Sequence, residues 1–147
     1  MTVGTKNSKL GKYISDLLKT KYIISTVSND MIGIEYSSSL KNIYSIMVGI
    51  AHGLGYGDNF VSVLISHSSK EMSDFIKAVH KTNRKINHSA YLGDLLVTTY
   101  SSFSRNRTFG DMIGKGYSIN SAKAEMNMIV EGYYATKNAF MLSKKLS

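Results

Sequence analysis

A short stretch in the second half of the chain combines one carboxylate with a cluster of cationic and amide side chains. Asp94 lies in a glycine-containing apolar segment, and the tetrapeptide Ser104–Arg107 (SRNR) follows a serine-rich bend. Ser104 can cap a helix, whose N-terminus presents unpaired N–H groups and the positive end of the helix dipole. Two arginines and an asparagine add further donors, so the stretch suits a phosphate or another doubly charged anion. A capped surface helix with two solvated arginines is the alternative.

A second candidate lies upstream, where Lys41 interrupts an apolar helical pattern. A buried lysine must find a partner or lose its charge, which is costly as packing and useful for proton transfer. A lysine at the flank of a helix can instead extend its ammonium group into solvent, and that arrangement is the commoner one. The apolar positions around Lys41 are Ile34, Leu40, Ile43, Tyr44, Met47 and Val48.

Five motifs in a fixed order connect the two candidates. They are SLKN at 39–42, GLGYGDN at 53–59, LGDLLVTT at 92–99, SRNR at 104–107 and IVEG at 129–132. In this order and at these separations they resemble the substrate domain of the bacterial type of NAD(P)-dependent glycerol-3-phosphate dehydrogenase. The resemblance runs from about Val3 to the C-terminus. It implies a mostly α fold, a multi-helix substrate domain similar to the C-terminal domain of 6-phosphogluconate dehydrogenase-like enzymes, preceded by a short strand-helix-strand remnant.

The resemblance also implies a reaction, the interconversion of sn-glycerol 3-phosphate and dihydroxyacetone phosphate with NAD or NADP, which supplies a precursor of glycerophospholipids. A carbonyl reduced by hydride needs a proton donor beside it. Lys41 matches the lysine to which the family assigns that role, and Asp94 matches the aspartate that would orient it. The expected substrate contacts come from Asn42, Thr98, Ser104, Arg105 and Asn106, and the expected cofactor contacts from Arg105, Ile129 and Glu131.

The same resemblance implies a division of the chain. We expect residues 1–30 to be the incomplete tail of a nucleotide-binding (Rossmann) domain, and residues 31–147 to be the helical substrate-binding and catalytic domain, truncated at its C-terminus. No GxGxxG turn is present to anchor the pyrophosphate of the cofactor. We therefore expect the chain to be inactive alone and to need the missing nucleotide-binding domain, with a homodimer as a further possibility. We also expect Lys41, Asp94 and Arg105 to converge on one pocket.

Two other functions are compatible with these motifs. The chain could be a non-catalytic remnant that binds a phosphorylated metabolite or a protein partner. It could also be a related dehydrogenase acting on a different 2-hydroxy acid, although the anion site expected at SRNR disfavours that activity.

Composition limits the remaining classes of protein. With 147 residues the chain suits one domain, and zero cysteines exclude disulfides and thiolate metal sites. The 18 Lys+Arg against 10 Asp+Glu give a net charge of +8, which attracts anions, yet nothing resembles a nucleic-acid motif. The four histidines show no metal-binding spacing, so we expect no metal site. No run approaches the ~18 apolar residues of a membrane helix, and we expect a cytoplasmic protein.

Hydrophobic periodicity and capping residues predict the elements. We expect a helix capped by Ser8, a strand over Tyr22–Val27, a long helix from Met31 to about Ile50, a helix from about Phe60 to Lys81 capped by Asp58 or Asn59, a helix from SRNR to Gly114, a short helix capped by Ser118, and a last helix over Met128–Lys145.

Overall fold

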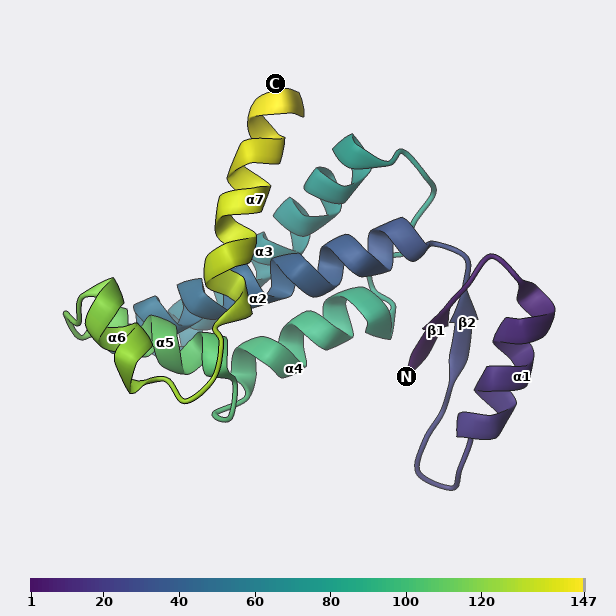
Figure 1. The fold of residues 1–147 in the computed structure, drawn as a ribbon, viewed down its shortest axis with the longest axis horizontal. Helices are drawn as coiled ribbons and strands as arrows, with labels where there is room; N and C mark the ends of the chain where they lie inside the picture. Colours follow the sequence, from purple (N-terminus) through teal and green to yellow (C-terminus); the bar gives the residue numbers. More distant parts are fainter. Residues whose placement is uncertain (147) are drawn as a thin grey trace.

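The computed structural model describes residues 1–146, and Ser147, the last residue of the expected helical domain, lies outside them. Within the described residues, seven α-helices, one π-helical turn and two short strands follow one another (Figure 1). They are β1 (Thr2–Gly4), α1 (Ser8–Leu18), β2 (Thr26–Ser28), α2 (Met31–Gly53), α3 (Asp58–Val79), η1 (Ser89–Gly93), α4 (Asp94–Tyr100), α5 (Arg105–Gly114), α6 (Ile119–Glu125) and α7 (Glu131–Leu146). The prediction of a mostly α fold preceded by a strand-helix-strand unit is confirmed.

The N-terminal unit is a single βαβ crossover. β1 and β2 pair in parallel, with Thr2 opposite Thr26, and α1 makes the connection that parallel strands require. The unit lies at one end of the molecule in Figure 1, beside the start of α2. The predicted strand over Tyr22–Val27 is wrong in position, because the hydroxyl of Thr20 accepts the N–H groups of Tyr22 and Ile23 and folds that segment into a turn.

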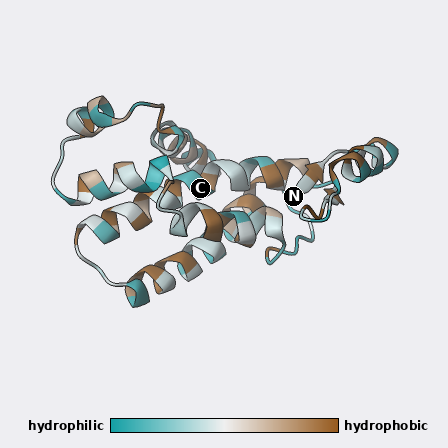
Figure 2. Ribbon diagram, turned by 90° about the horizontal axis from the view of Figure 1, so that it is seen from below, coloured by the Kyte–Doolittle hydropathy of each residue, from teal (hydrophilic) through white to brown (hydrophobic). Residues whose placement is uncertain are grey.

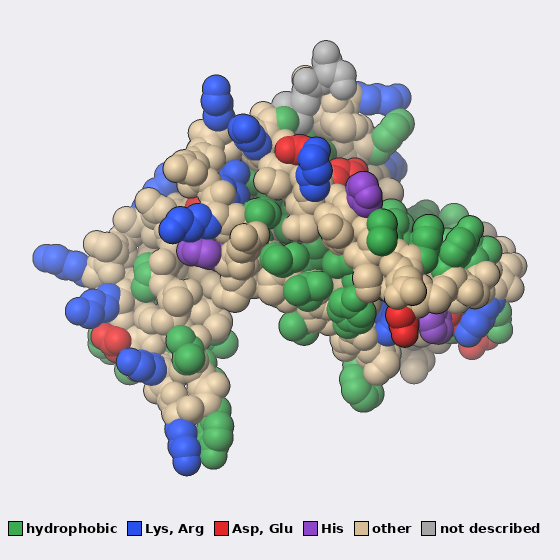
Figure 3. All heavy atoms as spheres, turned by 180° about the vertical axis from the view of Figure 1, so that it is seen from behind, with side chains coloured by type: hydrophobic (Ala, Val, Ile, Leu, Met, Phe, Trp, Pro, Cys, Tyr) green, Lys and Arg blue, Asp and Glu red, His purple; other side chains and the backbone are tan. Residues whose placement is uncertain are grey.

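Much of the apolar surface of this unit is open to solvent. At the right end of Figure 2 the unit carries brown hydrophobic positions, and at the left of Figure 3 separate lysine side chains, in blue, lie on the same unit. A two-stranded sheet is only marginally stable unless other elements pack against it. With much of its apolar surface exposed, this unit gains little stability from such packing. The large apolar side chains exposed on this unit are Met1, Leu10, Tyr13, Leu17, Tyr22, Ile23, Ile24 and Val27.

The long helix α2 runs through the middle of the remaining structure, and α3, α4, α5 and α7 all pack against it. Its apolar residues recur at helical spacing, so one face is buried against α3 and α4. None of the helices within residues 1–146 is both long and apolar enough to cross a membrane. The main core comprises Leu40, Tyr44, Val48, Val61, Ile65, Met72, Ile76, Tyr91 and Leu95.

Glycines allow the backbones of α2 and α5 to touch. A Cβ atom placed on Gly49 would lie 2.1 Å from the carbonyl oxygen of Arg107, and one on Gly110 would lie 2.1 Å from that of Ile46. Any larger residue at these two positions would force the helices apart. Two further glycines repeat the contact one turn along, Gly53 on α2 and Gly114 on α5.

Several helix boundaries differ from the predicted ones. Asn7, not Ser8, caps α1, because its side-chain oxygen accepts the N–H of Leu10 at 3.1 Å. Asp58 is the first residue of α3 and Gly57 precedes it as the cap, so neither predicted capping residue serves. The predicted last helix over Met128–Lys145 starts too early, since α7 begins at Glu131. Ser118 caps α6 as predicted, by accepting the N–H of Ser121.

A buried ion pair ties the start of α2 to the segment between α3 and η1. The Asp30 carboxylate caps α2 and accepts hydrogen bonds from the guanidinium of Arg84 and from the hydroxyl of Tyr91, the latter at 2.5 Å. Only 6% of the Arg84 side chain and 14% of the Asp30 side chain are exposed. The hydrogen bonds from Arg84 lower the pKa of Asp30 to about 2, against the opposing effect of burial.

This ion pair predicts a specific dependence of stability on acid. Because the pKa of Asp30 is lower in the folded chain, its contribution is fully present above the unfolded value near 3.8 and disappears as the pH falls toward about 2. At pH 7 the contribution is about 2 kcal/mol. Asp30→Asn should therefore lower the free energy of unfolding at pH 7 and flatten its change between pH 5 and pH 2, measured by urea denaturation.

Asp74→Asn is the matched control, because Asp74 forms an exposed pair with Lys70 on α3. Exposed pairs contribute little, so this variant should keep the acid dependence of the unchanged chain. An equal loss of stability in both variants would contradict the role of Asp30.

Candidate functional site

The two residues predicted to act in proton transfer lie in direct contact. Lys41 Nζ, from α2, is 2.7 Å from Asp94 Oδ2 at the start of α4. The Lys41 side chain is 20% exposed and that of Asp94 is 39% exposed, so a ligand can reach the pair from solvent. The arrangement positions an ammonium group and its counter-ion at the interface of two helices.

A π-helical turn sets the position of Asp94. The turn η1 ends at Gly93, and the backbone N–H of Asp94 donates back to carbonyl oxygens within η1. π-Helical turns are rare and concentrate at functional sites. Thr98 follows one turn later, and its hydroxyl donates to the Asp94 carbonyl oxygen at 2.7 Å. The Thr98 hydroxyl therefore serves α4 itself in this structure.

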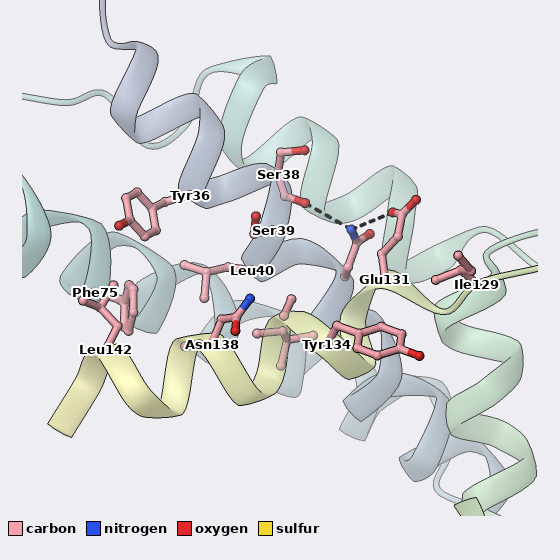
Figure 4. Close-up of a pocket in the computed structure, with 14 residues that line it drawn as sticks. Tyr36, Ser38, Ser39, Leu40, Phe75, Ile129, Glu131, Tyr134, Asn138 and Leu142 are labelled. Atoms are coloured by element: carbon pink, nitrogen blue, oxygen red, sulfur yellow. Dashed lines mark hydrogen bonds between the residues drawn. The ribbon is translucent and has the colours of Figure 1, made fainter. Parts of the chain in front are cut away.

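Asn42, next to Lys41, joins a network of side chains from α2, α5 and α7. The amide nitrogen of Asn42 donates to Glu131 Oε2 at 3.2 Å and to the Ser38 carbonyl oxygen at 3.2 Å (Figure 4). The amide nitrogen of Asn106 donates to Asn42 Oδ1 at 3.1 Å. The network fixes which way both amide groups face.

Asn106 was expected to contact the substrate, but its side chain lies in the interior. It is 6% exposed, and its Oδ1 accepts the backbone N–H of Gly132 at 2.9 Å. With its oxygen bonded to α7 and its nitrogen to Asn42, the side chain holds the start of α7 against α2 and α5. In this structure the hydrogen bond to Asn42 is therefore the link between Asn106 and the other candidate site residues.

Ser104 caps α5 and Arg105 is its first residue, so the SRNR motif predicted the start of this helix correctly. Ser104 Oγ accepts the N–H of Arg107 at 3.4 Å and lies 2.9 Å from the hydroxyl oxygen of Ser45. Arg105 Nη2 lies 3.4 Å from Glu131 Oε1, and its Nη1 lies 3.5 Å from the Met128 sulfur. These long contacts occupy two of the five donors of the guanidinium group, so donors remain for an anion.

Two cavities border these clusters. A cavity of about 570 Å³ between α2, α3 and α7 includes Asn42, Ile129 and Glu131 at one end and is otherwise mostly apolar (Figure 4). Asp94 lines a different cavity, of about 460 Å³, between α2, η1 and β1. Lys41 and Arg105 line neither cavity. Lys41, Asp94 and Arg105 were expected to converge on one pocket. In the structure their contacts instead form a row along α2, where Lys41 and Asn42 are chain neighbours.

Ser45 is the residue of this region that sequence reasoning missed. It lies one helical turn after Lys41 on the same face of α2, and it is fully buried. Its hydroxyl bonds to Ser104 of α5 and to the carbonyl oxygen of Thr98 in α4, at 2.9 Å and 3.1 Å. A polar residue at i+4 from the candidate lysine, within an apolar stripe, was the only sequence signal.

A separate ion cluster lies at the other end of α2 and α5. Asp111 accepts hydrogen bonds from His52 at 2.7 Å and from Lys115 at 2.6 Å. Burial acts to raise the pKa of Asp111, but the bonds from Lys115 and His52 outweigh it and lower the pKa. This cluster provides a lysine-aspartate pair remote from the candidate site.

The network predicts that Asn106 contributes mainly to stability. Asn106→Ala would leave the Gly132 N–H and the Asn42 amide without their partner, and an unsatisfied buried polar group costs ~1–3 kcal/mol. We expect a loss of that size in the free energy of unfolding, measured by urea denaturation. Asn138→Ala, an exposed change on α7, should stay within ~0.5 kcal/mol. Equal stability of the two variants would show that the buried amide bonds contribute nothing.

Comparisons with known proteins identify the family to which the chain is similar. A family model described as the C-terminus of NAD-dependent glycerol-3-phosphate dehydrogenase matches residues 30–147. The glycerol-3-phosphate dehydrogenase (NAD(P)+) of Fusobacterium nucleatum is 38% identical over 143 residues, which are 97% of this chain and 43% of that protein. The enzyme of the same name from Staphylococcus haemolyticus is 35% identical over 145 residues, or 99% of this chain and 44% of that protein.

Solved structures show the same fold. The crystal structure of glycerol-3-phosphate dehydrogenase from Coxiella burnetii has a TM-score of 0.92 and 31% identity, over 98% of this chain and 44% of that chain. The Plasmodium falciparum enzyme, at 19% identity, shares the fold with a TM-score of 0.87 over 98% of this chain and 42% of that chain. This chain spans less than half the length of these relatives. From the family match over residues 30–147, the chain belongs to the family of the C-terminal domain of NAD-dependent glycerol-3-phosphate dehydrogenase.

Proposed function

We propose that this chain is the substrate-binding and catalytic half of a glycerol-3-phosphate dehydrogenase, acting on sn-glycerol 3-phosphate or dihydroxyacetone phosphate. The observation that carries the proposal is the 2.7 Å contact between Lys41 and Asp94, adjacent on α2 to the amide of Asn42. In the reducing direction the Lys41 ammonium group donates a proton to the carbonyl oxygen of the substrate. In the oxidising direction the neutral amine takes that proton back, and Asp94 holds the amine in place in both directions.

The phosphate of the substrate fits the start of α5. A helix leaves its first N–H groups without intrahelical partners, and Arg105 adds a planar, charged donor group beside them. Asn42 is held by Glu131 and Asn106, so its amide is oriented before a ligand arrives. Both N–H groups of Asn42 already donate, to Ser38 and to Glu131, so its oriented Oδ1 is the atom that can accept from a substrate hydroxyl. A preoriented group loses less entropy when it binds, which favours affinity. Thr98 completes the polar lining of this region in the proposal.

The residues present also fit the nicotinamide end of NAD or NADP. Ile129 is 71% exposed and offers an apolar surface for a planar ring, and the Glu131 carboxylate can accept from a carboxamide. In the proposal Arg105 lies between the Glu131 carboxylate, which it contacts, and the phosphate of the substrate. When bound, the cofactor would supply or accept the hydride. The chain's own contribution is to orient the reactants and to move the proton at Lys41.

Residues 1–30 are, in this proposal, the last part of a nucleotide-binding domain, and residues 31–147 the helical domain. The parallel β1–β2 pair and the exposed apolar side chains of Tyr13, Leu17 and Ile24 support this division, because a larger sheet would cover them. Without that sheet one wall of the cleft is missing, and the proximity effect it provides can be worth ~7–11 kcal/mol. The chain alone should therefore be inactive.

The proposal predicts binding without turnover. In calorimetric titrations the chain alone should bind glycerol 3-phosphate weakly, and Arg105→Ala should weaken that binding about tenfold or more, the loss typical of a charged hydrogen bond. With NADH and dihydroxyacetone phosphate it should show negligible turnover. If Arg105→Ala left the affinity unchanged, the phosphate assignment would be wrong. A rate of ~1–10³ per second from the chain alone would refute its dependence on a second domain.

Complementation separates an enzyme half from a non-catalytic remnant. Adding the nucleotide-binding domain of the Fusobacterium nucleatum relative should restore turnover if the two halves re-form the cleft. Lys41→Ala should abolish that turnover while leaving phosphate binding largely intact. Lys115→Ala is the matched control, because it breaks another lysine-aspartate pair at the far end of α5, and it should leave turnover unchanged. Phosphate binding without any restored turnover would favour the non-catalytic alternative.

A further inference from the structure

The buried hydroxyl of Ser45 determines what the hydroxyl of Ser104 can offer to a ligand. Ser45 Oγ lies 3.1 Å from the carbonyl oxygen of Thr98 and 2.9 Å from Ser104 Oγ. A serine hydroxyl has one proton to donate and two lone pairs that accept. The carbonyl oxygen of Thr98 can only accept, so that contact is a hydrogen bond only if Ser45 donates its single proton there.

The position of Thr98 strengthens this assignment. Thr98 lies in the last turn of α4, where a helix leaves its carbonyl oxygens without intrahelical N–H partners. Ser45 is fully buried, and a carbonyl oxygen facing it without a proton would remain unsatisfied at a cost. Ser45 therefore donates its proton to the carbonyl oxygen of Thr98.

The direction of the Ser45 hydrogen bond also decides whether the Ser104 hydroxyl donates or accepts. With the Ser45 proton used, the 2.9 Å contact between the two hydroxyls requires Ser104 to be the donor and Ser45 the acceptor. One lone pair of Ser104 Oγ already accepts the N–H of Arg107, as the cap of α5. Ser104 is only partly buried, so a ligand that approaches it from solvent meets the second lone pair of its Oγ.

We infer that Ser45 is a positioning residue that makes Ser104 an acceptor, so that Ser104 selects a ligand hydroxyl and not an unprotonated phosphate oxygen. This inference rests on the proposed function, in which Ser104 contacts the substrate. Within that substrate it assigns the phosphate to Arg105 and the N–H groups of α5, and the terminal hydroxyl of the glycerol moiety, which does not face Lys41, to Ser104. Ser45 thereby acts on specificity without touching the ligand.

Neutron diffraction on the unliganded chain tests the assignment directly. We expect deuterium on Ser45 Oγ directed at the Thr98 carbonyl oxygen, and deuterium on Ser104 Oγ directed at Ser45. A deuterium on Ser45 directed at Ser104 would overturn the inference. This experiment involves no ligand, so its result does not depend on whether the chain binds glycerol 3-phosphate.

Ligand discrimination tests the consequence for recognition. We expect calorimetric titration of the unchanged chain to show a preference of about fivefold, the value for one hydrogen bond, for glycerol 3-phosphate over propane-1,2-diol 1-phosphate, which keeps the hydroxyl that faces Lys41 and lacks the terminal one. Ser45→Ala frees the Ser104 proton and should reduce the preference to less than about twofold. Ser104→Ala should do the same, and the double variant should show no further loss, because the two residues act as one unit.

Ser68→Ala is the matched control. Ser68 is equally buried on α3, and its hydroxyl donates to the Leu64 carbonyl oxygen at 2.8 Å, away from the site. This variant should keep the full preference even if it loses stability. An unchanged preference in Ser45→Ala or Ser104→Ala would overturn the inference. If the unchanged chain bound neither ligand, the proposed function would fail, and the deuterium positions alone would decide the role of Ser45.

Discussion

The close contact between the backbones of α2 and α5 is the constraint on which the rest of the structure depends. The paired glycines match Gly49 to Gly110 and Gly53 to Gly114, so the two helices run in the same direction with a fixed register. Near the start of α5 the same helix pair also brings the capping residue Ser104 within hydrogen-bonding distance of Ser45. A shift by one turn would move α5 by about 5.4 Å and separate every polar contact between these helices.

This register determines the order of charged and polar groups along α2. Lys41 meets Asp94 of α4, Asn42 meets Glu131 and Asn106, and Ser45 meets Ser104. Each side chain is held by a partner on a different helix, so the site is assembled only when α4, α5 and α7 have all packed against α2. Such groups need no reorganisation when a ligand arrives, which is the property that electrostatic catalysis requires.

The described α-helices other than α4 and the positions of the candidate residues could be predicted from the sequence, because both leave local signals. Apolar periodicity marked α2, and SRNR marked the start of α5. The strand expected at Tyr22–Val27 was displaced because one hydroxyl, that of Thr20, competes for the backbone there. The interior role of Asn106 could not be predicted, since it depends on a backbone N–H of α7, 26 residues away in the chain. The buried contacts of Ser45 likewise exist only once three helices are packed.

The π-helical turn η1 has a consequence for how this region tolerates insertion and deletion. A π turn closes its hydrogen bonds around one more residue than an α turn, so η1 holds an extra residue that an uninterrupted helix would exclude. Deleting one residue within Ser89–Gly93 could convert the segment to regular α-helix without breaking the chain path. The residues before it would then rotate by about 100° relative to α4. Either Asp94 would turn away from Lys41, or Tyr91 would leave Asp30, so the length of this short segment couples the Lys41–Asp94 contact to the anchoring of α2.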